Sequence, residues 1–349
     1  MRVRLAKSKD KIAWDNYVDT HPNSVPYCRF SWKDSVEKAY GHKAYYLLAE
    51  EEGAILGIFP LFLFRVPFLG DSLVSLPFCD VGGILANNEK CYKALLAEGF
   101  SIGSKGKVKN IEVRSCQKHP DELQENVDWF HSLETSKVRM LLKLPQSSEE
   151  LWKSFKSKLR SQVRKAEKNG LMFRWGDIDD LNSFYQVFSQ NMHDLGSPVH
   201  GRKWIESILM EFGDNARMGL IFKDEEPIGC GIILFTKHNV SIPWASTLRR
   251  YNRLSPNMML YWSFLKFAAD NEKKIFDFGR STPNEGTYRF KKQWGAEPDQ
   301  LFWYKFSIKE CDQQAIAGGK RQQVEQIWQK MPLFLANFIG PRIRKYISL

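Results

Sequence analysis

The sequence predicts an α/β (α+β) fold made of two copies of one unit, followed by a basic tail. Segments with helical spacing of apolar residues alternate with short apolar runs that are typical of strands. Two hairpins have the same character, YYLLAEEEGAILGIFPLFLF at 45–64 and MGLIFKDEEPIGCGIILFTK at 218–237, and each turns through acidic residues. The length of 349 residues also exceeds the usual size of one domain. We therefore expect two similar domains.

The first unit is expected at residues 1–145. Its predicted elements are helices at 14–19 and 32–39, a hairpin at 44–64, a strand at 72–77, a helix at 90–102 and a strand at 110–114. The helices follow from apolar spacing, and the hairpin from the turn Glu51-Glu52-Gly53 between two apolar runs. The polar stretch 145–150 can cap a helix and marks the boundary, because no long Gly-rich or Ser-rich linker separates the halves.

The second unit, at 146–310, repeats this order. Its predicted elements are helices at 151–169, 178–193 and 203–212, strands at 218–223, 228–235 and 240–246, a helix at 258–271 and a strand at 275–278. Ser147 or Ser148, followed by Glu149 and Glu150, predicts the start of the first helix. The remaining residues, 311–349, form the tail.

The net charge, the spacing of the cysteines and the length of the apolar runs limit the class of protein. The net charge of +11 predicts an anionic partner, such as nucleic acid, a phosphorylated precursor or a membrane face. The six cysteines are scattered and no two have C-x-x-C spacing, which argues against a disulfide framework and a zinc site. The longest apolar run, 54–64, is too short to span a bilayer, and the N-terminus has no signal-peptide character. We expect a cytoplasmic protein without a bound metal.

Positive charge is concentrated in residues 153–174, which hold eight basic residues and one acid, Glu167. The apolar residues of this segment recur at helical spacing: Trp152, Phe155, Leu159 and Val163. One stripe should therefore pack inward while the other face presents cations. Solvated helix faces usually mix both signs of charge. Two interpretations stay open, an ordinary solvated helix or a site where Arg160 and Arg164 bind a substrate phosphate or an RNA backbone.

A second segment follows the last predicted strand and combines a loop with cations and aromatic residues. It runs from Phe276 to Ala296 and reads FDFGRSTPNEGTYRFKKQWGA. Loops at strand ends often carry the chemistry of α/β proteins. The DFG triplet also occurs in kinases, but the chain has neither a G-x-G-x-x-G loop nor H-R-D, which argues against a kinase. It also lacks G-x-S-x-G, which argues against a hydrolytic triad.

This segment resembles the C-terminal signature of the FemAB-type branch of the GNAT acyltransferase superfamily, which includes peptidoglycan bridge-forming aminoacyltransferases. The versions associated with exosortase (PEP-CTERM) and exopolysaccharide loci look most similar. Other segments match in the same order: GIFPL at 57–61, SLPFCDVGG at 75–83, KLRSQVRKAEKNG at 158–170, NMHDLGSPVH at 191–200 and RLSPNMMLYW at 253–262. The resemblance covers roughly residues 1–310 and implies two tandem GNAT-like domains, with the transfer site in the second.

The resemblance also implies site residues. The Phe-Lys pair of Fem-type enzymes matches Phe290 and Lys291, so Lys291 would stabilise an oxyanion or a donor phosphate and Phe290 would shape the pocket. The available proton acceptors are Asp277, Glu285 and Tyr288, although Asp277 could instead cap the loop or pair with Arg280. The expected substrate-binding residues are Arg160, Arg164, His193, His200, Arg253, Ser255, Asn257, Arg280, Arg289 and Trp294. Both histidines border the expected acceptor loop and could instead be satisfied locally.

The resemblance leaves the donor open. A GNAT enzyme that uses acyl-CoA normally holds the pyrophosphate with N–H groups of a Gly-rich turn at a helix N-terminus. The corresponding segment, 249–257, reads RRYNRLSPN and has no glycine. Ser255 could cap the helix, Pro256 suits its first position, and three arginines could hold phosphates. We expect no tightly bound cofactor and either aminoacyl-tRNA or acyl-CoA as the donor.

The tail combines positive charge with apolar residues. From residue 313 onward it has six basic residues against Glu325. Its apolar residues are Val324, Ile327, Trp328, Met331, Leu333, Phe334, Leu335, Phe338 and Ile339. Pro332 and Pro341 are expected to break any helix. The tail could bind an anionic membrane surface or pack back on the domain.

The sequence thus predicts a transferase of the cytoplasm, peripheral at the inner face of the cell membrane. It would move an aminoacyl or acyl group onto an amine of a phosphorylated cell-envelope precursor of peptidoglycan or exopolysaccharide, with tRNA as a partner if the donor is aminoacyl-tRNA. One alternative is an acyl-CoA-dependent N-acetyltransferase or N-acyltransferase that acts on a small molecule or sugar. The alternative of another class is a non-enzymatic RNA-binding protein.

Overall fold

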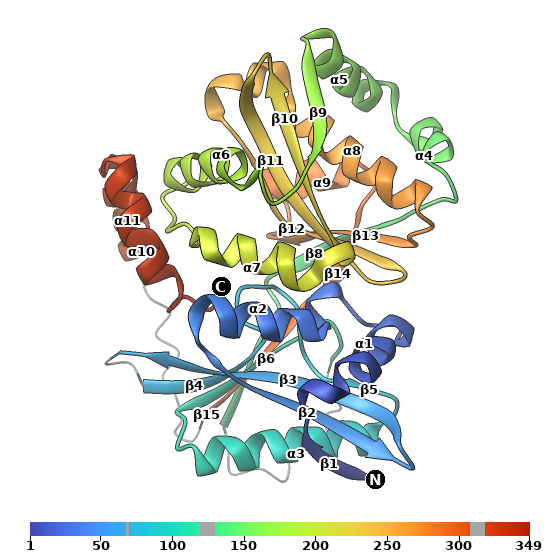
Figure 1. Cartoon of the computed structure of the whole chain (residues 1–349), viewed down its shortest axis with the longest axis vertical. Helices are drawn as coiled ribbons and strands as arrows, with labels where there is room; N and C mark the ends of the chain where they lie inside the picture. Colours follow the sequence, from blue (N-terminus) through green and yellow to red (C-terminus); the bar gives the residue numbers. More distant parts are fainter. Residues whose placement is uncertain (68–69, 119–129, 308–317) are drawn as a thin grey trace.

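A computed structural model describes residues 1–67, 70–118, 130–307 and 318–349. Figure 1 shows two α/β units stacked one above the other, with the last two helices alongside both. Each unit has a mixed sheet flanked by helices, and this confirms the expected fold class. The expected junction of domain and tail at 310/311, and with it Cys311, lies outside the described residues.

The first unit surrounds an eight-stranded sheet whose main order is β1-β2-β3-β4-β6-β15-β7, with β5 paired to β3. Its elements are β1 (Arg2–Leu5), α1 (Lys11–Thr20), α2 (Phe30–Tyr40), β2 (Lys43–Glu51), β3 (Ala54–Val66), β4 (Gly70–Ser75), β5 (Leu85–Ala86), α3 (Glu89–Lys105), β6 (Asn110–Ser115), β7 (Phe130–Glu134) and β15 (Phe302–Ser307). Buried apolar residues of β2 and β3 face α3 on one side of the sheet and α1 and α2 on the other.

The second unit surrounds a seven-stranded sheet of order β14-β8-β13-β12-β11-β10-β9. Its elements are β8 (Val138–Lys143), α4 (Ser148–Ser154), α5 (Ser157–Lys168), β9 (Leu171–Gly176), α6 (Leu181–Asp194), α7 (Arg202–Phe212), β10 (Ala216–Lys223), β11 (Glu226–Phe235), β12 (Asn239–Thr247), α8 (Pro256–Asp270), β13 (Ile275–Ser281), α9 (Gly286–Lys292) and β14 (Glu297–Gln300). Every strand and helix expected in this half has a counterpart, with the changes at α4 and α5 given below.

The order of elements confirms that one unit is used twice. Each unit runs from a strand through two helices and three antiparallel strands to a helix and a parallel strand. The two hairpins noted in the sequence are β2–β3 and β10–β11, which occupy equivalent places. The parallel pairs that follow, β4–β6 and β12–β13, are also equivalent.

The two units exchange strands that lie next to the edge of each sheet. β8 precedes the expected boundary at 145/146 but pairs with β13 and β14 of the second sheet. β15 follows the second unit but pairs with β6 and β7 of the first sheet. The chain passes between the units twice, just before β8 and just before β15. These two segments lie side by side, because the Leu301 N–H donates to the Lys137 carbonyl oxygen at 3.3 Å. Sheet membership therefore does not follow the division into 1–145 and 146–310.

Helices α2 and α7 join the units through equivalent residues. Trp32 is the third residue of α2 and Trp204 the third of α7, and their fully buried rings meet edge to face at 5.2 Å. The Ser35 hydroxyl donates to the carbonyl oxygen of Ser207 at 3.3 Å, and these are the sixth residues of the two helices. Figure 1 shows the two helices facing each other across the middle of the molecule. The repeat is thus related by an approximate two-fold arrangement.

The helix expected at 151–169 is wrong as a single element. The chain leaves the helical conformation at Phe155, whose φ and ψ are −72° and 142°, and α5 begins afresh after Lys156. Burial explains the break, because the Phe155 ring packs edge to face on Trp262 at 5.8 Å and on Trp294 at 5.5 Å. Ser147 supplies the expected cap by accepting from the Glu150 N–H at 3.2 Å.

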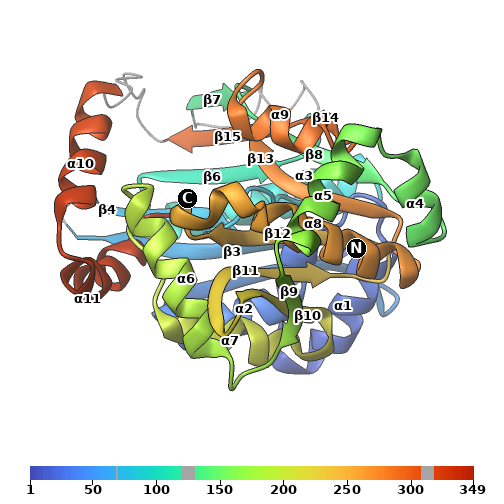
Figure 2. The same cartoon turned by 90° about the horizontal axis from the view of Figure 1, so that it is seen from above.

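The tail forms α10 (Gly318–Lys330) and α11 (Leu333–Arg344) and packs on the domains. Figure 2 shows both helices along one side of the molecule, beside α6. The break expected at Pro332 separates them, but the one expected at Pro341 is wrong, because α11 continues through it. In the ranges that the structure describes, no helix has the length and apolar character needed to cross a bilayer.

Candidate active site

The candidate site lies where β12 and β13 separate. They pair in parallel only from Asn239 to Ser241, opposite Ile275 to Asp277, while β12 continues to Thr247. Because the strands run in the same direction, the segments that follow both leave from one edge of the sheet. This edge therefore gathers the loop after β13, helix α9 and the start of α8.

Lys291, on α9, points back under the end of β13. Its ammonium donates to the carbonyl oxygens of Gly279 at 3.0 Å and Arg280 at 2.7 Å. The side chain is only 8% exposed. Burial lowers its pKa to about 8, although the carboxylates of Asp277 and Asp80 oppose the shift. Lys291 thus holds an amine that changes charge close to neutral pH at the end of β13.

Asp277 shapes the turn that receives this lysine. Its Oδ1 accepts from the Gly279 N–H at 2.7 Å, and Gly279 has a φ of +76°, a conformation that favours glycine. Arg139 on β8 lies 3.9 Å from the other carboxylate oxygen. Burial raises the pKa of Asp277, against the lowering effect of Arg139 and the Gly279 N–H. The carboxylate therefore caps the loop, which is one of its two structural interpretations. The other is wrong, because the nearby cation is Arg139, whereas Arg280 pairs with Asp80.

Asp80 brings the first domain to the same place. It lies in the segment SLPFCDVGG, and its Oδ2 accepts from the Arg280 N–H at 3.2 Å while Oδ1 lies 3.3 Å from Arg280 Nε. The Asp80 carbonyl oxygen accepts from Trp303 Nε1 at 3.1 Å, and the Arg280 guanidinium lies over that ring at 5.2 Å. Two segments that the sequence singled out 200 residues apart thus meet at the junction of the domains.

Two further arginines surround this junction. The buried Arg114 lies 5.6 Å from the Trp303 ring and donates to the Ser348 carbonyl and hydroxyl oxygens at 3.1 and 2.9 Å. Arg344, at the end of α11, lies 5.7 Å from the Phe78 ring. Burial lowers the pKa of Arg344 to about 10, and the charges of Arg114 and Arg280 act in the same direction. The tail therefore adds a cation to a junction that is already basic.

The other site residues expected in the segment 276–296 differ in how deeply their side chains are buried. Phe290 packs on Tyr261 at 5.0 Å beside Lys291, which suits a residue that shapes a pocket. Tyr288 is half-buried under the ammonium of Lys292 at 5.8 Å. Arg289 and Glu285 are exposed. Trp294, expected to bind substrate, is only 1% exposed and belongs to the core beside Phe155.

The start of α8 lies at the same sheet edge. Arg253 is exposed at the end of a 3₁₀ turn, and Ser255 and Asn257 are half-buried. Pro256 is the first residue of α8, as expected. The expected cap is wrong, because the Ser255 side chain forms no capping hydrogen bond and its φ is +65°. The backbone turns so sharply here that the hydroxyl does not reach the N–H groups of the next turn.

The basic segment confirms its expected inner stripe. Phe155, Leu159 and Val163 are buried, while Arg160 and Arg164 lie on the outer side of α5. The Arg164 guanidinium lies 5.5 Å from the Trp152 ring, and Arg160 donates to the Lys153 carbonyl oxygen at 3.4 Å. No carboxylate pairs with either arginine among the described residues.

The two histidines contact the domain interface and the tail. His200 is buried at the domain interface, with Nδ1 hydrogen-bonded to the Tyr40 hydroxyl at 2.6 Å and the ring stacked on Trp204. His193 Nε2 lies 2.7 Å from the Met331 carbonyl oxygen of the tail. His200 is thus held locally by its neighbours, whereas Nδ1 of His193 is buried without a hydrogen-bond partner in the described ranges of the chain.

Sequence reasoning assigned no role to four of these residues: Asp80, Arg114, Trp303 and Arg344. Asp80 lay within a matching segment, so its position was a usable signal. Arg344 was counted only as tail charge. The position of Trp303 beside Asp80 and Arg114 depends on strand exchange. No group of three or more His, Cys, Asp or Glu side chains suited to a metal ion occurs in the described part of the chain.

Comparisons with known proteins agree with this arrangement. Residues 153–292 match the model of the Acetyltransferase (GNAT) domain family, a stretch that includes Lys291 but ends before Trp294. No curated protein sequence matches the chain.

Three solved structures have a similar fold. The crystal structure of FemX has 17% identity and a TM-score of 0.69, over 93% of this chain and 100% of that one. The C-terminal domain of an Agrobacterium fabrum protein assigned as lysylphosphatidylglycerol synthetase has 10% identity and a TM-score of 0.58, over 92% and 97%. A tandem GNAT protein of the clavulanic acid biosynthesis pathway has 10% identity and a TM-score of 0.55, over 89% and 100%. At these identities the likeness shows the fold, two GNAT domains in tandem.

Proposed function

We propose that this acyltransferase, with its FemAB-like tandem GNAT fold, moves an aminoacyl or acyl group onto an amine of a phosphorylated cell-envelope precursor. The observation that carries the proposal is Lys291, whose buried ammonium lies at the end of β13 within the domain that matches the acetyltransferase family. The reaction belongs in the cytoplasm, where charged tRNA and acyl-CoA are both present.

Lys291 suits the stabilisation of an oxyanion. In the transfer, the acceptor nitrogen forms a bond to the donor carbonyl carbon, and negative charge builds on the carbonyl oxygen before the ester or thioester bond breaks. An ammonium held in a low-dielectric site favours that charge more than water does. The acceptor nitrogen loses a proton, for which Asp277, Glu285 and Tyr288 remain the candidate acceptors.

The cations around the site favour a phosphorylated substrate. Arg280 and Arg344 lie at the junction, and among the described carboxylates only Asp80 forms an ion pair with either of them. Guanidinium groups recognise phosphate oxygens through paired hydrogen bonds. A similar structure is assigned to the synthesis of lysylphosphatidylglycerol, an amino acid joined to an anionic lipid, so this fold is compatible with an anionic acceptor.

An acyl-CoA donor remains the second candidate because the start of α8 lies at the same sheet edge as Lys291. Arg249, Arg250 and Arg253 cluster there and could hold a pyrophosphate, although Arg250 is paired with Glu226. An aminoacyl-tRNA donor would instead use the cations on the outer side of α5, including the half-buried Arg160 and the exposed Arg164. RNA binding without catalysis would use the same helix.

Two experiments separate these candidates. Thermal-shift measurements with acetyl-CoA and with aminoacyl-tRNA identify the donor that stabilises the fold; stabilisation by acetyl-CoA alone would contradict the tRNA donor. With that donor, Lys291→Ala should lower transfer about 100-fold or more, the usual effect of removing an oxyanion stabiliser. Lys292→Ala is the matched control, because Lys292 is the exposed neighbour. Full activity in Lys291→Ala would reject the proposed role.

A further inference from the structure

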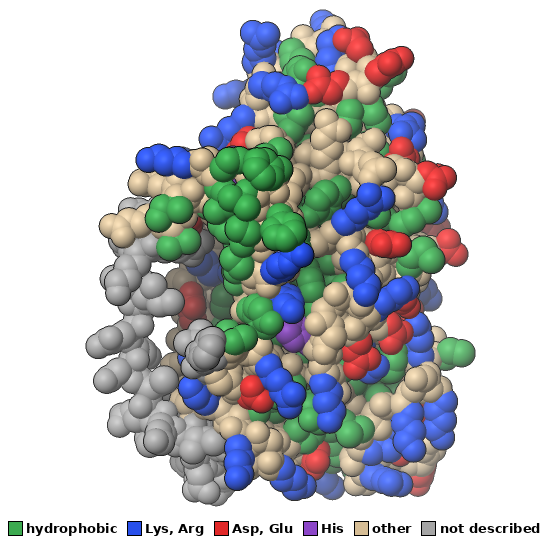
Figure 3. Space-filling view, turned by 60° about the vertical axis from the view of Figure 1, so that its left-hand side comes forward, with side chains coloured by type: hydrophobic (Ala, Val, Ile, Leu, Met, Phe, Trp, Pro, Cys, Tyr) green, Lys and Arg blue, Asp and Glu red, His purple; other side chains and the backbone are tan. Residues whose placement is uncertain are grey.

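The outer face of the tail helices carries a row of exposed apolar side chains. Exposed fractions are 61% for Val324, 64% for Ile327, 76% for Phe334, 61% for Phe338 and 40% for Ile343. Isolated apolar residues are normal on protein surfaces, but a contiguous group marks a binding surface. Figure 3 shows hydrophobic side chains gathered on the face that carries the tail, with Lys and Arg side chains beside and below them. We call this row the tail ridge.

The opposite face of the tail helices is fixed to the protein. Trp328 and Ala336 are buried, and the Asn337 amide donates to the Ser189 hydroxyl of α6 at 3.3 Å. The Gln329 amide donates to the Asp194 carbonyl oxygen at 3.0 Å. The tail ridge therefore stays on the outside of a docked element, and it does not face the core.

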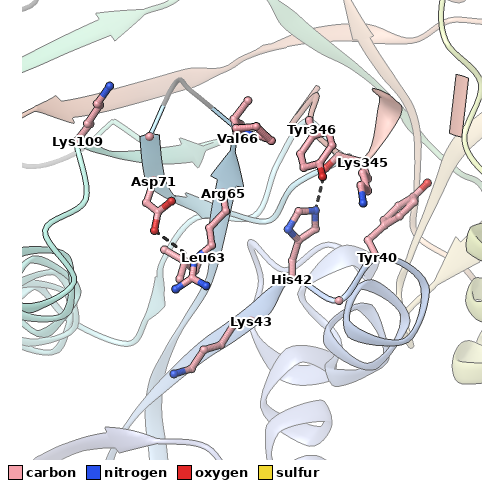
Figure 4. A pocket seen from close by; sticks show the side chains of 13 residues that line it. Tyr40, His42, Lys43, Leu63, Arg65, Val66, Asp71, Lys109, Lys345 and Tyr346 are labelled. Carbon is pink, nitrogen blue, oxygen red and sulfur yellow. Dashed lines mark hydrogen bonds and ion pairs between the residues drawn. The ribbon is translucent and has the colours of Figure 1, made fainter. Parts of the chain in front are cut away.

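A cationic pocket of about 690 Å³ adjoins the end of the tail ridge. Its charged lining residues are Lys43, Arg65, Asp71, Lys109 and Lys345, four cations and one acid. Figure 4 shows Arg65 and Asp71 paired on one side, at 3.2 Å, and His42 beneath the tail on the other. His42 Nε2 lies 2.8 Å from the Lys345 carbonyl oxygen, so the pocket wall and the tail are joined. Lys345 directly follows α11, which connects the pocket to Ile343.

We infer that the tail ridge and this pocket together form a docking site for an anionic phospholipid membrane. The apolar side chains would enter the boundary between headgroups and acyl chains, while the pocket receives lipid phosphates. Charge complementarity selects this occupant, because an apolar protein partner would have no use for the cations beside the ridge. The inference concerns where the protein binds and does not depend on the transfer reaction.

Vesicle flotation with the full chain tests this inference. We expect binding to vesicles of phosphatidylcholine and phosphatidylglycerol, at about a two-to-one ratio, to exceed binding to pure phosphatidylcholine by about tenfold or more. Phe334→Ser with Phe338→Ser should lower binding by about tenfold or more, because both side chains are exposed and leave the core intact. Ile12→Ser with Met210→Ser is the matched control, since these side chains are 76% and 60% exposed elsewhere.

A second pair of variants tests the pocket. Lys43→Gln with Arg65→Gln should remove the preference for phosphatidylglycerol, and inorganic phosphate at moderate concentration should not compete with the vesicles. Equal binding to both vesicle types, or unchanged binding of the Phe334→Ser, Phe338→Ser protein, would overturn the inference. A dimer in sedimentation that the same two substitutions convert to a monomer, without vesicle binding, would show that a second copy covers the ridge.

Discussion

The equivalent strands β6 and β13 end beside different buried cations. Arg114, at the end of β6, donates to Glu112, to the carbonyl oxygens of Leu76 and Cys79, and to Ser348. A guanidinium stays charged, and here each of its three nitrogens donates at least one hydrogen bond. Lys291, under the end of β13, has two carbonyl partners and a pKa lowered by burial to about 8. The same place in the fold therefore holds a structural cation in one domain and a titratable one in the other.

This difference assigns separate tasks to the two copies. The first domain supplies Asp80, which fixes Arg280 and the loop after β13, and Arg114, which ties down the end of the tail. The second domain holds the titratable amine of Lys291. Substitutions at the α2–α7 contact, to which both domains contribute equivalent residues, should lower the free energy of unfolding. Substitutions at Lys291 should lower the rate of transfer.

The largest effect on stability is expected at the α2–α7 contact, where the two domains place equivalent residues. Trp32→Ala and Trp204→Ala each remove a fully buried ring from the α2–α7 contact, so each should lower the free energy of unfolding by about 3–5 kcal/mol. Urea denaturation measures both values. If one variant were nearly as stable as the native protein, the two-fold arrangement would not describe the interface.

Removal of the structural cation should have the next largest effect. Arg114→Met leaves the buried carbonyl oxygens of Leu76 and Cys79 without their donor, which should lower the free energy of unfolding by about 3 kcal/mol. Arg217→Gln, at an exposed position, should change it by less than about 0.5 kcal/mol. Similar values for the two variants would show that Arg114 does not lock the first domain.

The titratable cation predicts a pH dependence of stability. The pKa of Lys291 is about 8 in the folded protein and 10.5 in the unfolded chain, so between these values the unfolded state binds more protons. Stability relative to Lys291→Met should therefore rise by roughly 2 kcal/mol as the pH increases from about 8 to about 10.5. Chemical denaturation at several pH values measures the difference. A constant difference would mean that Lys291 is not desolvated.

The smallest effect on stability is expected at the basic helix. Neutralising Lys156, Arg160 and Arg164 should change the free energy of unfolding by less than about 0.5 kcal/mol, because α5 packs through its other face. A transferase that uses α5 for an anionic substrate should show a raised KM with little change in kcat. Loss of RNA binding in this variant, with no transfer activity in the native protein, would favour the RNA-binding alternative.

The sequence was sufficient to predict what local patterns control. The hairpins, α6, α7 and α8 follow from apolar spacing, and the match of Phe290 and Lys291 to a family signature directed attention to α9. The break at Phe155 could not be predicted, because it depends on rings from two distant segments. Strand exchange by β8 and β15 depends on pairing across more than a hundred residues, and that pairing alone brings Trp303 to Asp80.

The most direct test of the account is the pH dependence of single-turnover transfer in the native protein and in Lys291→Arg. The rate of the native protein is divided by the rate of Lys291→Arg, because this ratio cancels the ionisation of the acceptor amine. Lys292→Arg provides the control. If Lys291 acts as a protonated stabiliser, this ratio should fall as the pH rises through about 8. A ratio that rises through the same pH would make Lys291 a base, and a flat ratio would place the chemistry elsewhere.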